Sequence, residues 1–66
     1  MTDNSLELMR MLAVRQATGL SRAYIYYLER KGLFPRRVKM GRASAWVRME
    51  VLDFIRNKIA ERELSK

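Results

Sequence analysis

The run Thr18-Gly19-Leu20-Ser21 constrains this chain most strongly, because it can end one helix and begin another within four residues. Glycine readily adopts the left-handed conformation that closes many helices, and serine is among the best caps for the first turn of the next helix. We therefore predict a short helix over residues 12–18 and a second helix over residues 21–31. Leu20 is expected to pack into the core beneath the turn. Two short helices joined in this way form a helix-turn-helix.

The second predicted helix ends at Gly32 and has two different faces. At 100° per residue, Ile25 and Leu28 share one side, which we predict to be buried. The opposite side is aromatic and cationic and is expected to be exposed; it carries Ala23, Tyr26, Tyr27 and Arg30. Tyr24 lies nearer the apolar side, and we expect it to pack there.

A β-hairpin is predicted after this helix, because Pro35 prevents the helix from continuing. We predict strands over residues 36–40 and 45–47, joined by a turn over residues 41–44. Along the first strand, Arg37 and Lys39 share one face, while Val38 and Met40 share the other. The hairpin is therefore expected to present cations on one side and to pack against the core on the other.

A third helix is predicted over residues 48–63, and residues 8–11 alternate weakly, as in a short strand. The helix carries an apolar stripe of Val51, Leu52, Ile55 and Ile59, with Phe54 on its flank. Trp46 is expected in the core, where the hairpin meets this helix. The fold class is thus mainly α with a small β-hairpin, a winged helix-turn-helix.

A chain of 66 residues makes one small domain. We place it at residues 8–62, between a frayed N-terminal tail, residues 1–7, and a C-terminal tail, residues 63–66.

The charge of the chain is concentrated in residues 22–48. This block holds eight of the fourteen Lys and Arg residues but only one of the seven acids, Glu29, which leaves six of each elsewhere. Each cation placed on a phosphate releases a condensed counterion, so this segregation predicts a surface that binds a polyanion. Cations also deter edge pairing of exposed strands, which is the alternative interpretation for the hairpin. The candidate DNA contacts are Arg22, Ala23, Tyr26, Tyr27, Arg30, Lys31, Arg36, Arg37, Lys39, Arg42 and Ser44.

Other classes of protein receive little support from the composition. The chain has no Cys and therefore no thiol nucleophile or thiolate zinc site, and it has no His, the commonest general base and metal ligand. We therefore expect neither an enzyme nor a metal or cofactor site. Glu50 and Asp53 are interpreted as acids that favour the start of the third helix. No apolar run approaches the ~20 residues of a membrane helix, and no signal peptide is evident. A cytoplasmic protein is therefore expected.

Three blocks of sequence, spread over residues 10–62, follow one another in a distinctive order. They are Ala17-Thr18-Gly19-Leu20-Ser21-Arg22-Ala23-Tyr24-Ile25-Tyr26, then Phe34-Pro35-Arg36-Arg37-Val38-Lys39-Met40-Gly41 followed by Trp46, and finally Glu50-Val51-Leu52-Asp53-Phe54-Ile55. In this order and spacing they resemble the AlpA family of prophage and genomic-island regulators. The resemblance implies a MerR-like, excisionase-type winged helix that binds double-stranded DNA.

Two departures from the family pattern bear on the interface. Leu12-Ala13 stands where the family usually has Pro-Glu, which removes a helix-start signal but no expected contact. The turn Gly41-Arg42-Ala43 is one residue shorter than in the family pattern. The length of this turn decides which cation of the hairpin can reach a groove.

We therefore expect a sequence-specific transcriptional regulator of a prophage or mobile element. Its second helix, residues 21–31, would enter the major groove, and its wing, residues 35–47, would lie on the backbone or in the minor groove. An excisionase that acts with an integrase would use the same surface. A small basic adaptor or inhibitor that binds an acidic protein would explain the charge but not the helix-turn-helix pattern.

One recognition helix reads only a few base pairs, so we expect a dimer or a cooperative array on repeated sites. Integrase and RNA polymerase are the candidate protein partners.

Overall fold

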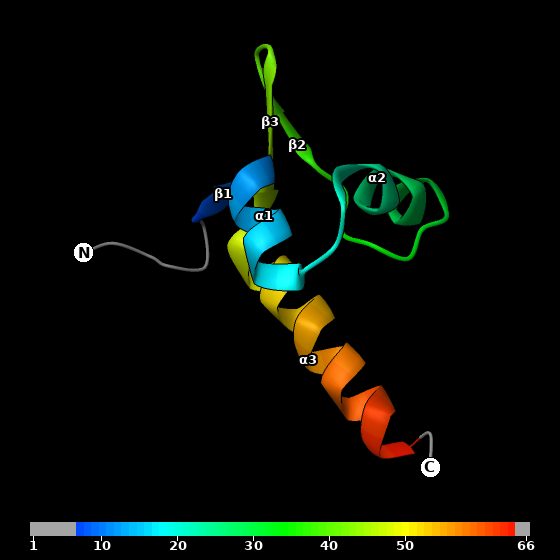
Figure 1. Ribbon diagram of the computed structural model, residues 1–66. Coiled ribbons are helices and arrows are strands. Elements are labelled where there is room, and N and C mark those ends of the chain that lie inside the picture. The colour runs from blue at the N-terminus through cyan, green and yellow to red at the C-terminus, as the bar shows by residue number, and fades with distance from the viewer. Residues whose placement is uncertain (1–6, 65–66) are drawn as a thin grey trace, which may run out of the picture.

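Three helices and a small antiparallel sheet make up the computed structural model, which describes residues 7–64 (Figure 1). The elements in chain order are β1 (Leu8–Arg10), α1 (Met11–Thr18), α2 (Arg22–Arg30), β2 (Val38–Met40), β3 (Ala43–Val47) and α3 (Arg48–Leu64). The sheet order is β1-β3-β2, so the return strand of the hairpin is central, with Met9 opposite Trp46 on one side and Lys39 opposite Ser44 on the other. The predicted fold class is confirmed.

The turn between α1 and α2 has the predicted chemistry. Gly19 adopts a φ of 75°, and its N–H donates to the carbonyl of Arg15 at 2.8 Å. The Ser21 hydroxyl accepts a hydrogen bond from the Tyr24 N–H at 3.1 Å, which satisfies one of the free donors of the first turn of α2. Leu20 is half-buried and packs against the core. In contrast, Arg10 at the N-cap of α1 makes no side-chain capping bond, as the missing start signal implies.

Helix α2 ends at the second predicted glycine. Gly32 has a φ of 75°, its N–H donates to the Glu29 carbonyl at 3.1 Å, and the Leu33 N–H donates to the Leu28 carbonyl at 2.9 Å. These two bonds match the Schellman motif, which satisfies the last carbonyls of a helix. The chain therefore leaves α2 in a fixed direction toward Phe34 and the hairpin.

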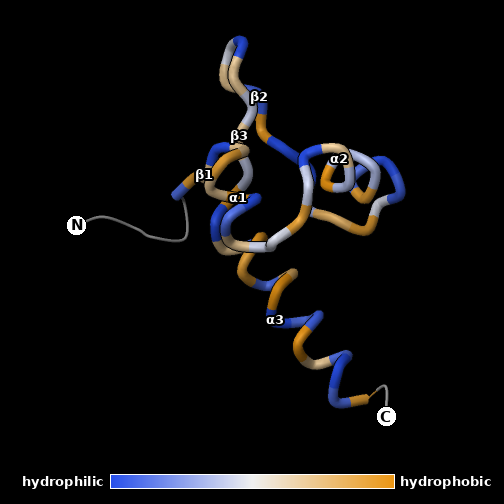
Figure 2. The backbone as a smooth tube through the Cα atoms, in the orientation of Figure 1, coloured by the Kyte–Doolittle hydropathy of each residue, from blue (hydrophilic) through white to orange (hydrophobic). Residues whose placement is uncertain are grey.

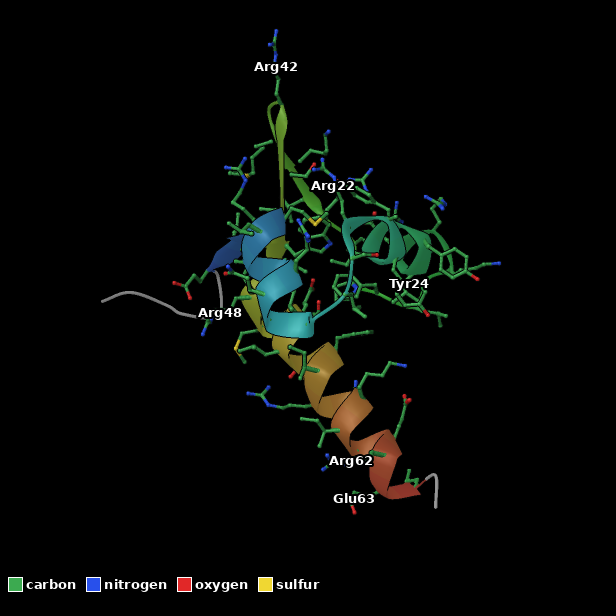
Figure 3. All side chains as sticks on the ribbon, in the orientation of Figure 1. Arg22, Tyr24, Arg42, Arg48, Arg62 and Glu63 are labelled. Carbon is green, nitrogen blue, oxygen red and sulfur yellow. The ribbon has the colours of Figure 1, made fainter. Side chains whose placement is uncertain are left out.

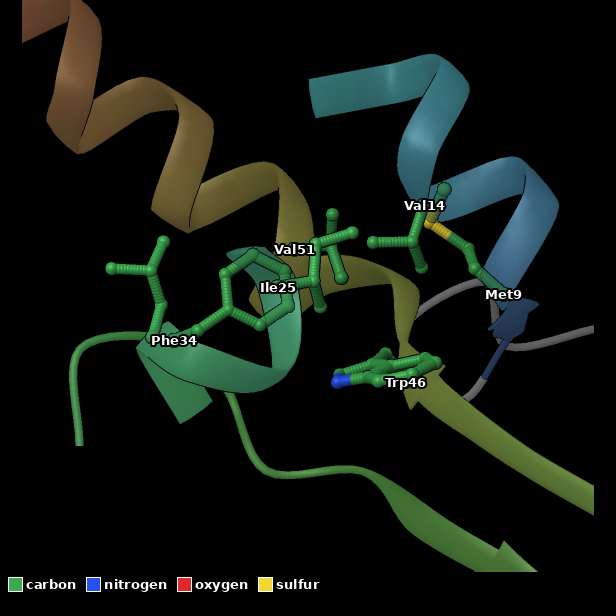
Figure 4. Packing of buried hydrophobic residues seen from close by; sticks show 7 residues of the cluster. Met9, Val14, Ile25, Phe34, Trp46 and Val51 are labelled. Atoms are coloured by element: carbon green, nitrogen blue, oxygen red, sulfur yellow. The ribbon is translucent and has the colours of Figure 1, made fainter. Parts of the chain in front are cut away.

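The core is built from every element except β2 (Figure 4). Trp46 is fully buried, as predicted, and so are Val14, Ile25 and Val51. The rings of Phe34 and Phe54 meet edge to face with their centroids 4.7 Å apart, which joins the loop after α2 to α3. The complete cluster consists of Met9, Val14, Ile25, Leu28, Phe34, Trp46 and Val51.

Two tyrosines of α2 exchange their predicted environments. Tyr24, expected to pack, is 48% exposed and stacks on Tyr27, with centroids 5.6 Å apart. Tyr26, expected on the exposed face, is half-buried, with its ring 6.3 Å from that of Trp46. Both predictions were wrong because the ring of Tyr26 lies beside the buried indole of Trp46, whereas Tyr24 lines an open hollow between α2 and α3.

The hairpin turn is tighter than predicted, and strand β2 has no packed side. Residues 36 and 37 precede β2, and β3 already begins at Ala43, so Gly41 and Arg42 alone connect the strands. Gly41 has a φ of 66°, which suits the first central position of such a turn. All three residues of β2 are exposed, including Val38 and Met40, because the hairpin projects past the core (Figure 1).

Helix α3 is well predicted in its first half and leaves the core in its second half. Val51 is buried and Ile55 is half-buried, but Ile59 is 50% exposed, against the prediction of a continuous stripe. Figure 2 shows hydrophobic and hydrophilic residues alternating along α3 as it extends away from the other elements. No helix within residues 7–64 is long and apolar enough to cross a membrane.

The predicted tails lie largely outside the described residues, at positions 1–6 and 65–66. We expected Glu7 to fray, but its backbone carbonyl accepts a hydrogen bond from the Arg48 N–H at 2.7 Å. Its carboxylate also forms an ion pair with the Arg48 guanidinium at 3.3 Å. Residues 63 and 64 continue α3 rather than forming a tail.

Candidate nucleic-acid interface

The predicted cations of α2 and of the hairpin line one concave surface. A hollow of about 760 Å³ lies between them, lined by Tyr26, Glu29, Arg30, Gly32, Arg36, Arg37 and Lys39. Four of the predicted contacts in this hollow are cations, and they come from α2, from the loop that follows it and from β2. The fold therefore gathers residues nine positions apart in sequence onto one basic surface.

The other predicted contacts lie around this hollow rather than in its lining. Arg22 and Ala23 are exposed in the first turn of α2, and Lys31 is exposed at its end. Arg42 is at the tip of the hairpin, and its side chain points away from the body of the molecule (Figure 3). Ser44 is half-buried on β3, opposite Lys39.

Tyr26 is held between cations rather than presented freely to solvent. The guanidinium carbon of Arg37 is 5.0 Å from the centre of its ring, and that of Arg22 is 6.0 Å away. Its ring also lies beside the indole of Trp46 in the core, with the ring centroids 6.3 Å apart. Such cation–π contacts are attractive and orient the guanidinium groups. Tyr26 thus helps to place two predicted DNA-contacting arginines.

Tyr27 has a similar but more exposed environment. It is 43% exposed, stacks on Tyr24, and lies under the Lys31 ammonium at 5.6 Å from the ring centre. This aromatic pair extends the surface of α2 away from the hairpin. An exposed ring on this helix can contact a thymine methyl group or donate its hydroxyl to a phosphate.

Glu29 also lines the hollow, although the sequence pattern assigned it no role there. Its carboxylate accepts a hydrogen bond from the Arg37 backbone N–H at 2.7 Å and pairs with the Arg37 guanidinium. The Glu29 side chain is only 11% exposed, whereas that of Arg37 is 37% exposed. The sequence did mark Glu29 as unusual, because it is the lone acid within the basic block of residues 22–48.

Within residues 7–64 no three His, Cys, Asp or Glu side chains are grouped so that they could hold a metal ion. The acid and base partners of α3, such as Asp53 and Arg56 at 2.7 Å, are exposed surface pairs. What the surface provides is a cationic helix beside a cationic hairpin.

Helix-turn-helix, hairpin and basic surface together define a winged helix-turn-helix domain of the DNA-binding class. Residues 7–59 match the family described as prophage CP4-57 regulatory protein (AlpA), and the chain belongs to this family of prophage regulatory proteins. The resemblance inferred from the three sequence blocks is thereby confirmed.

A phage relative supports the same assignment. The chain is 41% identical over 56 residues to the uncharacterized protein ORF88 of Enterobacteria phage P4. The match covers 83% of this chain and 64% of the phage protein, so the chain spans less than two thirds of that relative.

Proposed function

We propose that the protein is a sequence-specific DNA-binding regulator of prophage genes that inserts α2 into the major groove. Helix α2 has nine residues, and an α-helix with its side chains is about 10–12 Å in diameter. This diameter fits the major groove, which is roughly 12 Å wide. Arg22, Ala23 and Arg30 would approach base edges, with Tyr27 and Lys31 beside them.

The observation that carries this proposal is the single basic hollow shared by α2 and the hairpin. Arg30 of α2, Arg36 of the loop and Lys39 of β2 line it together. If α2 lies in the major groove, these hairpin-side cations lie over the neighbouring phosphates. Arg42 at the tip would then reach the backbone or the adjacent minor groove.

A salt series tests this proposal. Binding to duplexes from the region upstream of the protein's own gene is measured by fluorescence anisotropy. With about five phosphates neutralised, the slope of log affinity against log salt should be about −4 to −5. Arg62→Ala is the matched control, because Arg62 lies near the far end of α3 (Figure 3), and its removal should leave the slope unchanged. A slope near zero contradicts DNA binding, and persistent pull-down of an acidic protein after nuclease treatment would then favour the adaptor hypothesis.

The excisionase alternative uses the same surface and differs only in output. A recombination assay with the integrase of the same element separates the two roles: stimulated excision supports an excisionase, and a change in reporter transcription alone supports a regulator. Either role places the protein on double-stranded DNA, in the cytoplasm and associated with the nucleoid. RNA polymerase and the integrase are the corresponding candidate partners.

A single copy would read only a short site, so we further propose binding to repeated or adjacent sites. One recognition helix covers about 4–6 base pairs, too few to define an operator. Analytical ultracentrifugation with and without operator DNA should show two or more copies per duplex. Tight 1:1 binding to a lone short site would contradict this stoichiometry.

A further inference from the structure

We propose that Glu29 and Arg37 form a clamp that fixes the hairpin relative to α2, and that both are positioning residues rather than DNA contacts. The inference rests on the proposed DNA-binding function and refines it. It also changes the role of Arg37, which the sequence pattern had assigned to phosphate contact.

The contacts place the clamp at the junction of the two basic elements. Glu29 lies in the last turn of α2, and Arg37 directly precedes Val38, the first residue of β2. The carboxylate binds both the backbone N–H and the guanidinium of the same arginine. Two bonds to one residue restrict its rotation as well as its distance. The direction in which β2 departs is therefore tied to α2.

A second contact extends the clamp to the core. The Arg37 guanidinium lies over Tyr26, and the Tyr26 ring lies beside Trp46 of β3. Because Trp46 is fully buried, these contacts connect the clamp to the hydrophobic core. A guanidinium can pair with a carboxylate and stack on a ring at once, whereas an ammonium group lacks this planar geometry.

Electrostatics indicates that Glu29 serves geometry rather than affinity. A carboxylate in the basic hollow repels the phosphates of DNA, so charge alone would favour any neutral residue at position 29. Its pairing also neutralises Arg37, which can then release few counterions. If Glu29 fixes the hairpin, its loss should weaken binding to the specific site. If Glu29 is only a solvated acid, its loss should strengthen binding to every duplex.

The two predictions have opposite signs, and Glu29→Gln separates them. We expect this variant to bind the operator selected from random duplexes about tenfold more weakly, a loss in the range found for coupled residues of one hydrogen-bond network. Its affinity for a scrambled duplex should stay equal or rise. A rise of equal size on both duplexes would overturn the proposal. Asp53→Asn is the control, because it removes an acid from an exposed ion pair on α3 and should change neither affinity.

Arg37 provides an independent measurement. Arg37→Ala should lose about the same affinity for the operator as Glu29→Gln, with an unchanged salt slope, and the double variant should lose no more than either single one. If Arg37 contacts a phosphate instead, the salt slope falls by about 1, the loss is equal on every duplex, and the proposal is wrong. Arg37→Lys keeps the charge but not the planar group, so the clamp predicts a loss here as well, and full activity would contradict it.

Hydrogen exchange tests the clamp without DNA. The Arg37 amide should be protected in the free wild-type protein and exchange at least tenfold faster in Glu29→Ala. Thermal unfolding of each variant confirms that the domain remains folded at the assay temperature. An Arg37 amide that is unprotected in the wild type refutes the clamp even if DNA binds. Protection together with a flat salt response refutes the proposed function and leaves the clamp as a structural feature.

Discussion

Helix α2 and the β2–β3 hairpin carry similar charge but are anchored in different ways. Helix α2 buries Ile25 and Leu28 and is closed at both ends by Ser21 and Gly32. Strand β2 is exposed at all of its residues and is held by backbone pairing with β3 and by Glu29. Phosphate contacts fix the register and orientation of a protein on the duplex, whereas base contacts read the sequence. The element that buries side chains in the core is the one proposed to read bases, and the hairpin depends on Glu29 for its position.

The largest expected difference between the two elements is in folding stability. Ile25→Ala should lower the free energy of unfolding by about 2–5 kcal/mol, because it opens a cavity in a small core. Val38→Ala, at a residue 37% exposed on β2, should lower it by less than about 1 kcal/mol. Urea unfolding of both variants measures the two values. Equal losses would show that the hairpin is anchored as firmly as α2.

A smaller effect is expected for base recognition. Arg30→Ala on α2 should weaken binding to the selected operator by about 1–3 kcal/mol and relax the preference at one or two base pairs. The exposed side chain makes no contact with the core, so the stability of the domain should not change. Selection of random duplexes with both proteins measures the preference. An unchanged consensus would remove Arg30 from the base-reading set.

The cap of α2 provides a test of the helix anchor itself. Ser21→Ala removes the acceptor for the Tyr24 N–H and should lower stability by about 1 kcal/mol. Ser21→Gly serves as a comparison, because glycine is a tolerated cap and should cost only a few tenths of a kcal/mol. Thermal unfolding distinguishes the two. Equal midpoints for Ser21→Ala and the wild type would show that the core alone defines the start of α2.

The smallest effect is expected at the tip of the hairpin. Arg42→Ala should reduce the magnitude of the salt slope by about 1 and weaken operator and scrambled duplexes alike. Anisotropy titrations on both duplexes across a salt series measure this. A loss confined to the operator would instead place Arg42 in a groove. It would contradict the division into a helix that recognises bases and a hairpin that contacts phosphates.

Local chemistry allowed much of the fold to be predicted. The positions of Gly19, Ser21 and Gly32 defined both ends of the turn and the end of α2, because their effects act through neighbouring backbone groups. The burial of Ile25 and Trp46 followed from helical spacing and residue size. These features depend on a few adjacent residues, which is why a linear pattern could report them.

The incorrect predictions share a different cause. A helical projection gives the angle of Tyr24 or Tyr26 about its own axis but not where Trp46 or α3 lies beyond it. The alternation of Val38 and Met40 likewise indicates two faces of a strand without showing that neither face is covered.

The sequence by itself determined the helix-turn-helix, the segregation of charge into residues 22–48 and membership of the AlpA family. Only the tertiary structure brought Arg30, Arg36 and Lys39 to one hollow and turned Glu29 toward Arg37. The physical reason is that capping and periodicity are short-range properties of the backbone. The approach of α2 to the hairpin depends on how elements distant in the sequence pack into one core.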